Sequence, residues 1–118
     1  MLLTVLAAAA AFAAQEPQVV NGVIVRPEWE RIPTPEEMRR PAHTDWSPQG
    51  EVVLLCTVVN DGRIDDCKVQ PPAPADQRVT AYAVGLTRFV RHNTRLQDGS
   101  SAIGLKVRIP IRLETTES

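Results

Sequence analysis

The feature that most constrains this chain is an Asp-Gly pair, Asp61-Gly62, which lies between two β-prone segments that each carry one cysteine. Asp-Gly is a strong signal for a two-residue hairpin turn, because both turn positions require positive φ angles. The segments on either side, residues 51–60 and 63–70, are therefore predicted as a pair of antiparallel strands. Counting outward from the turn places Cys56 directly opposite Cys67.

The predicted register brings the two cysteines within bonding distance. Directly opposed residues of an antiparallel pair have Cα atoms about 4.5 to 5.5 Å apart, which a disulfide can span. We predict a structural Cys56–Cys67 bridge rather than a redox pair, because thiol oxidoreductases place their cysteines close together at a helix start. The same register assigns one face of the hairpin to the core: Leu54, Cys56, Val58, Cys67 and Val69.

A third strand is predicted at residues 103–113, where apolar and mostly basic positions alternate strictly. The apolar positions are Ile103, Leu105, Val107, Ile109, Ile111 and Leu113, and the basic ones are Lys106, Arg108 and Arg112. Pro110 has no N–H to give to a ladder, so this strand is expected at a sheet edge. The basic face allows two interpretations. It is either a solvated face whose charges deter aggregation, or part of a strand edge that accepts an extended peptide and selects acidic partners by its charges.

Between the hairpin and the last strand, the spacing of apolar residues predicts a helix over residues 77–93 with Asp76 as its N-cap. Its apolar stripe is formed by Val79, Tyr82, Leu86 and Phe89. A right-handed crossover then leaves the first strand central. The predicted fold is α+β: a three-stranded antiparallel sheet (β-β-α-β, order 2-1-3) with one helix packed on one face.

The N-terminal region is predicted to contain an export signal. Residues 1–14 are almost wholly apolar, which is too short for a membrane span of about 20 residues. Ala11-Phe12-Ala13 offers the small residues of a cleavage site, so residues 1–13 are interpreted as a signal peptide cleaved after Ala13. The protein is then expected in the periplasm. The alternative is that the true start lies upstream and that a membrane anchor has been lost.

The rest of the chain divides into three predicted parts. Residues 14–27 are interpreted as a linker, and residues 28–49, which contain Trp29 and Trp46 among several prolines, as an N-terminal extension. Within the extension, Thr34 followed by Pro35 looks like the start of a short helix. Residues 50–114 form the predicted globular domain.

Composition and motif content argue against several functions. A net charge of −1, from 13 basic and 14 acidic residues, gives no broad basic surface for nucleic acid. His43 and His92 lie in separate segments without further ligands at a recognisable spacing, so no metal is expected. No residues assemble an acid, a base and a nucleophile. We therefore expect neither an enzyme nor a cofactor.

The sequence resembles the C-terminal domain of TonB-type energy transducers over about residues 29–113. The similar segments are residues 50–56 (GEVVLLC), 60–69 (NDGRIDDCKV), the helix with Ala81, Ala83 and Phe89, Asp98-Gly99, and residues 107–113 (VRIPIRL). The paired cysteines, with Trp29 and Pro33 upstream, resemble a proteobacterial branch of that family.

The resemblance implies a periplasmic module of TonB-dependent transmembrane transport that binds a segment of an outer-membrane TonB-dependent receptor by strand addition. The binding edge is expected along the last strand: Leu105, Lys106, Val107, Arg108, Ile109 and Arg112. Transducers begin with a spanning helix and a long spacer, which the short apolar run here does not match. Peptide binding rather than force transmission is therefore expected. The alternative is an envelope-assembly protein that forms homodimers through the same edge.

Overall fold

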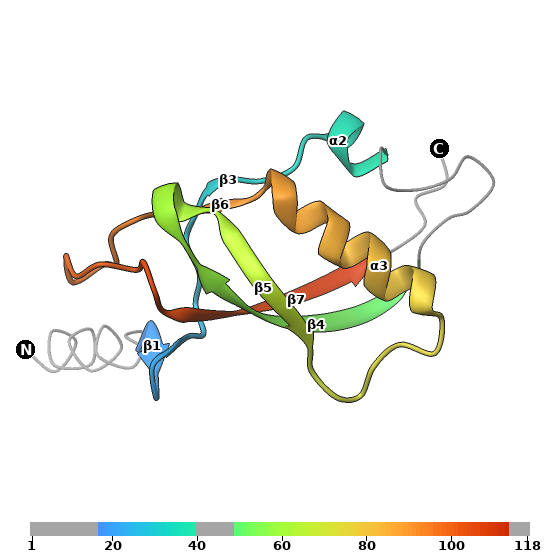
Figure 1. Ribbon diagram of the computed structural model, residues 1–118, viewed down its shortest axis with the longest axis horizontal. Helices are drawn as coiled ribbons and strands as arrows, with labels where there is room; N and C mark the ends of the chain where they lie inside the picture. The colour runs from blue at the N-terminus through green and yellow to red at the C-terminus, as the bar shows by residue number, and fades with distance from the viewer. Residues whose placement is uncertain (1–16, 40–48, 114–118) are drawn as a thin grey trace, which may run out of the picture.

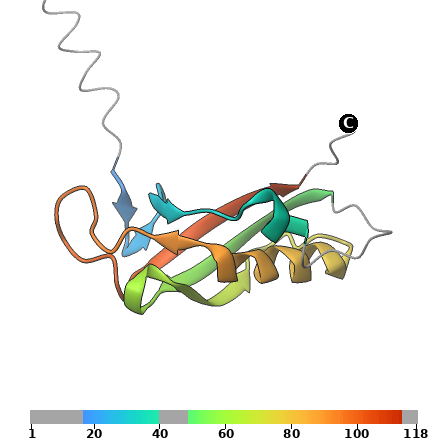
Figure 2. The ribbon, with the colours of Figure 1, turned by 90° about the horizontal axis from the view of Figure 1, so that it is seen from above.

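The computed structural model describes residues 17–39 and 49–113 of the chain. Its main element is a mixed five-stranded sheet with the order β1-β2-β7-β4-β5. The three long strands are β4 (Gly50–Val58), β5 (Ile64–Val69) and β7 (Lys106–Leu113). Helix α3 (Gln77–Leu86) lies across one face of the sheet (Figures 1 and 2).

The N-terminal strands enlarge the sheet beyond the predicted three strands. Strands β1 (Val19–Val20) and β2 (Val23–Ile24) form a hairpin within the segment predicted as a linker. β2 runs parallel to the start of β7, with Val23 opposite Lys106 and Ile24 opposite Val107. The prediction of a three-stranded antiparallel sheet is therefore wrong, although the three predicted strands are neighbours in the expected order. β7 is not an edge strand along its whole length.

A second, two-stranded sheet pairs β3 (Trp29–Arg31) with β6 (Arg91–His92). The predicted helix over residues 77–93 is therefore too long: α3 ends at Leu86, and a 3₁₀ turn, η2 (Thr87–Phe89), leads into β6. The expected N-cap is confirmed, because the Asp76 side chain accepts a hydrogen bond from the Arg78 N–H at 2.9 Å.

A short helix, α2 (Pro35–Arg39), begins where the Thr34-Pro35 pair predicts it. The Glu37 N–H donates to Thr34 Oγ1 at 3.1 Å and the Thr34 N–H donates to Glu37 Oε1 at 3.0 Å. This reciprocal pair satisfies donors that a helix start leaves without partners. A hydrogen bond from the Arg31 side chain, followed by the one from the Thr34 backbone, lowers the pKa of Glu37.

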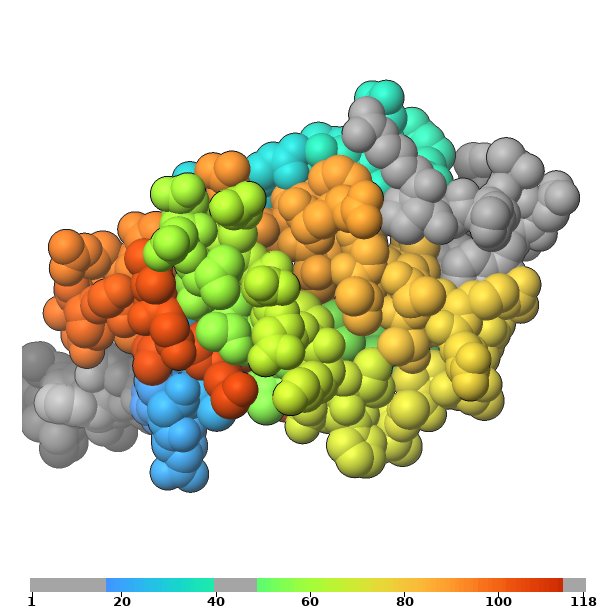
Figure 3. Space-filling view, viewed as in Figure 1, coloured from blue at the N-terminus to red at the C-terminus, as the bar shows by residue number. Residues whose placement is uncertain are grey.

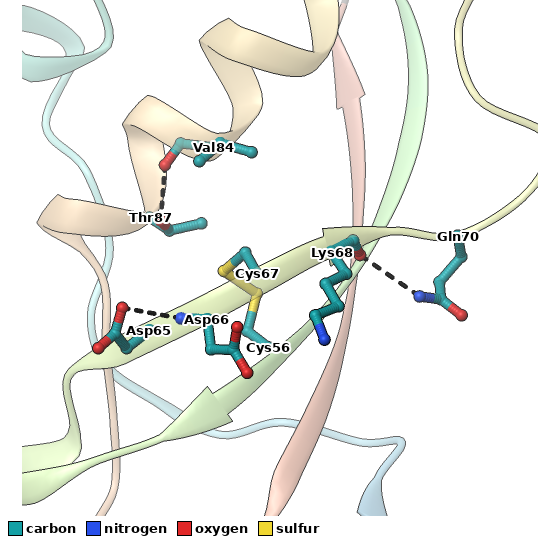
Figure 4. The surroundings of a disulfide bond; sticks show 8 residues. All are labelled: Cys56, Asp65, Asp66, Cys67, Lys68, Gln70, Val84 and Thr87. Carbon is teal, nitrogen blue, oxygen red and sulfur yellow. Dashed lines mark hydrogen bonds between the residues drawn. A yellow bond between two sulfur atoms is a disulfide. The ribbon is translucent and has the colours of Figure 1, made fainter.

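In the β4–β5 hairpin the two cysteines pair as predicted, but the turn and the strand register next to it differ from the prediction. The turn has three residues, η1 (Asn60–Gly62), so Thr57 faces Asp65 instead of Asp66. A bulge between Leu55 and Thr57 then restores the register, with Asp66 at a positive φ of 52°. Beyond the bulge Leu55 faces Lys68, and the Cys56–Cys67 disulfide joins the strands with Cα atoms 4.0 Å apart (Figure 4).

The core lies between α3 and the face of the sheet that carries Leu54, Cys56 and Val58, as the alternation of the hairpin predicts. Its largest fully buried side chains are Ile24, Leu54, His92, Val52, Val58, Val107 and Cys56. Ile24 shows that β2 is part of the core, because its side chain is 0% exposed. Strand β2 is therefore an integral part of the domain.

None of the helices in the described segments is long and apolar enough to span a membrane. The predicted signal peptide, residues 1–13, lies outside the described residues, as do His43 and Trp46.

Candidate functional site

The candidate site is the side of β7 that faces away from β4. β7 pairs with β4 along its whole length, from Lys106 opposite Thr57 to Leu113 opposite Gly50. Pro110 faces Val53, whose carbonyl accepts a hydrogen bond at 2.8 Å from the N–H of Gln70 on the β5 side. The backbone groups of a residue in an antiparallel ladder point to the same side, so those of Val53 point to β5 and those of Pro110 point away from β4.

The alternation of the ladder extends this assignment along β7. Val58 donates from its N–H to the Leu105 carbonyl at 2.9 Å, so odd-numbered residues of this strand bond to β4. Arg108, Pro110 and Arg112 therefore direct their backbone groups outward. We call this row, residues 108–113, the β7 edge. The missing N–H of Pro110 costs the sheet nothing, because it would have pointed away from β4.

Strand β2 covers the first part of the predicted binding edge. Lys106 and Val107 pair with it, and Leu105 precedes β7 and bonds to Val58. Arg108, Ile109 and Arg112 have no register partner in β2. The parallel pairing of Ile24 with Val107 nevertheless engages the outward N–H of Arg108, because Ile24 then bonds to the residues on either side of Val107. The structure thus divides the predicted edge: β2 occupies it as far as the Arg108 N–H, and beyond that point no strand of the described segments pairs with its outward side.

Side chains of the β7 edge alternate between two environments. Arg108 and Arg112 are exposed on the face opposite α3, whereas Ile109 is 8% exposed and belongs to the core. On the open face Arg108 lies opposite Leu55, which in turn faces Lys68 of β5. Figure 4 shows the Lys68 side chain directed away from the helix. The two basic residues therefore flank a half-buried leucine.

Charge on this face is partly balanced. Arg112 Nε lies 3.7 Å from Glu51 Oε1, and both side chains are 72% exposed. An exposed ion pair at that separation is worth little. Arg108, Lys106 and Lys68 have no acidic partner among the residues that the structure describes. The open face beside the β7 edge is consequently basic.

Sequence reasoning missed two contributors to the site. β2 blocks the start of the edge, and a two-residue strand gives no periodic signal. Gln18 secures this strand, because its Oε1 accepts a hydrogen bond from the Gln97 N–H at 3.0 Å and its Nε2 donates to Glu28 Oε1 at 3.3 Å. The available hints are the two short apolar runs Val19-Val20 and Val23-Ile24-Val25, which could form a short extended segment.

His92, considered above as a metal ligand, is instead a buried structural residue. Its Nε2 accepts a hydrogen bond from the Glu28 N–H at 3.0 Å, and its Nδ1 bonds to the Asn93 carbonyl at 2.7 Å. The ring meets Trp29 edge to face at 5.4 Å between centroids. Across the described ranges, no group of three or more His, Cys, Asp or Glu side chains could hold a metal ion.

Comparison with known proteins gives one similarity and no family. An uncharacterized protein of Caulobacter vibrioides is 33% identical over 61 residues, which cover 52% of this chain and 61% of that protein. This chain therefore spans less than two thirds of its relative. No protein-family profile matches the sequence. No solved structure matches it either.

Proposed function

We propose that this protein is a periplasmic, non-enzymatic binding module, similar to the C-terminal domain of TonB, that captures an extended peptide of a partner protein by strand addition. The partner we propose is an outer-membrane TonB-dependent receptor, which would connect the module to TonB-dependent transport. The observation that carries the proposal is the β7 edge. Beyond the Arg108 N–H, which β2 engages, Arg108 and Pro110 each direct a carbonyl away from β4, and Arg112 directs an N–H and a carbonyl the same way.

The two faces of the β7 edge predict the chemistry of the captured strand. Residues of the bound peptide that lie opposite Arg108 and Arg112 would be on the open, basic face of the sheet, where acidic side chains are favoured as cross-strand partners. Alternate residues would lie beside Ile109 and Ile111, which are buried and half-buried. We therefore propose a segment in which acidic and apolar residues alternate.

The same geometry disfavours the alternative, a homodimer formed by two β7 edges. Antiparallel pairing of two copies through their outward groups matches Arg108 with Arg108, Pro110 or Arg112 of the other copy. These registers set like charges opposite each other or lose hydrogen bonds at Pro110, and both effects oppose pairing. An envelope-assembly role through self-association is therefore the second candidate, and an acidic partner strand is the first.

Strand addition is tested by Arg112→Pro, which removes an outward N–H beyond β2 and leaves the bonds of β7 to β4 and to β2 intact. The matched control is Arg112→Ala, which removes the charge and keeps the N–H. The probe is a synthetic peptide from the plug segment of an outer-membrane receptor, titrated by calorimetry. We expect Arg112→Pro to weaken binding by at least about tenfold, and by clearly more than Arg112→Ala does.

Unchanged peptide affinity of Arg112→Pro would refute the β7 edge as the binding site. Light scattering on the same variants distinguishes the second candidate: a dimer in the unmodified protein that Arg112→Pro converts to a monomer would favour self-association. Export is tested separately, by the mass of the protein recovered from the periplasm. Cleavage after Ala13 predicts a mature chain that starts at Ala14.

A further inference from the structure

A hollow at the β5 side of the sheet is lined by two arginines whose side chains have no partner among the described residues. It measures about 350 Å³ and is lined by Val59, Arg63, Ile64, Asp65, Thr87 and Arg88. It lies where the hairpin turn and the start of β5 meet η2, just after α3. Figure 3 shows these two segments side by side on the visible face. Since β5 is the far strand of the sheet from β2, this hollow is separate from the β7 edge.

Arg63 and Arg88 bring positive charge to the hollow, and Asp65 is the acidic residue among those that line it. Neither Arg63 nor Arg88 forms a hydrogen bond or ion pair through its side chain within the described ranges. Arg63 also lies directly opposite Arg91 in an antiparallel bridge. Like charges at directly opposed positions destabilise a strand pair. An anion bound in the hollow beside Arg63 would reduce that cost.

The remaining residues that line the hollow indicate which kind of molecule would carry the anionic group. Ile64 is 9% exposed and lies with half-buried Val59 beside the two arginines, so the hollow has an apolar part. Asp65 uses Oδ1 to accept a hydrogen bond from the Asp66 N–H at 2.8 Å, and its other oxygen has no partner in the described segments. The hollow therefore offers two cationic donors, an apolar surface and one acceptor.

The walls of the hollow are held in place by neighbouring contacts. Gly62 packs against the His92 backbone, and the disulfide joins the middle of β5 to β4. Thr87 Oγ1 donates to the Val84 carbonyl at 2.6 Å, which fixes the side chain at the end of the helix. Figure 4 shows Thr87 above the strand that carries Asp65 and Cys67. Such preorganisation lowers the entropy cost of binding.

We propose that this hollow binds the C-terminal residue of a peptide. The free carboxylate accepts hydrogen bonds from the guanidinium groups of Arg63 and Arg88, which are suited to carboxylates by charge and geometry. The terminal side chain packs on Ile64 and Val59, and the terminal backbone N–H donates to Asp65. Recognition of a chain terminus is independent of strand addition at the β7 edge.

The probe is an acetylated Ala-Ala-Val tripeptide with a free carboxylate, compared with its C-terminal amide. Binding is followed by the backbone amide resonances of the full chain. We expect the free acid to shift the resonances of residues 59–65 and 87–88, and the amide to bind at least about tenfold more weakly. Arg63→Gln and Arg88→Gln should each weaken binding of the acid, and Arg108→Gln, on β7, should not.

Three results would overturn the proposal. The acid and the amide could bind equally, the shifts could fall outside the hollow, or inorganic phosphate could bind as tightly as the tripeptide, which would leave an anion site without peptide recognition. Arg63 and Arg88 are both exposed at the surface, so their substitution should leave the fold intact. An unchanged far-ultraviolet circular dichroism spectrum verifies this for each variant.

Discussion

Gly62 lies directly against His92: a Cβ atom on Gly62 would overlap the His92 carbonyl oxygen. This contact joins the β4–β5 turn to the second sheet, and Arg63 and Arg91 extend it as an isolated bridge. The turn glycine therefore has two roles. It adopts a φ of 79°, and it allows a close approach of two backbones.

We predict that Gly62→Ala lowers the free energy of unfolding by more than about 2 kcal/mol, because the methyl group meets backbone rather than a movable side chain. Gly99→Ala is the matched control. Gly99 has a φ of 87° and nothing within 4 Å of its Cβ position, so only the conformational cost of about 1 kcal/mol remains. Urea denaturation measures both. Equal losses would show that the contact with His92 carries no energy.

The disulfide should contribute strongly to stability. Replacing Cys56 and Cys67 together by alanine is predicted to lower the free energy of unfolding by roughly 3 kcal/mol, because the bridge restricts the unfolded chain. Reductant should destabilise the natural protein and leave the double variant unchanged. Alkylation of the unreduced protein followed by intact mass provides the direct check. Two labelled thiols in the unreduced protein would contradict the bridge.

His92 should be required for its two hydrogen bonds rather than for its volume. His92→Phe keeps a ring beside Trp29 but leaves the Glu28 N–H and the Asn93 carbonyl without their partners. We expect a loss of about 2 kcal/mol in urea denaturation, the cost of leaving two partly buried polar groups unsatisfied. Trp29→Phe is the control, since it retains an aromatic contact, and should cost about 1 kcal/mol. A His92→Phe variant as stable as the natural protein would contradict this role.

The N-cap of α3 predicts a dependence of stability on pH. A hydrogen bond from the Arg78 side chain, then one from its backbone, lowers the pKa of Asp76. Because the folded pKa lies below the unfolded one, this stabilisation is complete above the ordinary aspartate range. It is lost as the pH falls through the folded value.

Asp76→Asn tests this dependence, because asparagine is also a good N-cap but carries no charge. The difference in unfolding free energy between the natural protein and Asp76→Asn should be largest near neutral pH. It should shrink as the pH drops below about 4. Asp76→Ala, which removes the cap itself, should be less stable than Asp76→Asn at every pH. A difference that does not change with pH would exclude the charge as its source.

Short-range patterns in the sequence determined the individual elements. The Asp61-Gly62 turn with alternating strands predicted the hairpin and the disulfide, and Asp76 and Thr34 predicted two helix starts. These features depend on residues that are close in the chain. A turn, a cap or a period of two is decided by backbone geometry and nearby side chains. The cysteine pairing held despite the extra turn residue, because the bulge at Asp66 compensates for it.

Only the tertiary structure decided which strands adjoin. Ile24 pairs with Val107, which is distant from it in the sequence. His92 lies within the segment predicted as helix, but in the structure it is in a strand and pairs with Trp29. Both pairings involve very short strands, whose residues carry no period of their own. Their stability comes from burial against distant neighbours rather than from local preference. For this reason the sequence alone could indicate a binding edge on β7, and the fold had to show that β2 pairs with its first half.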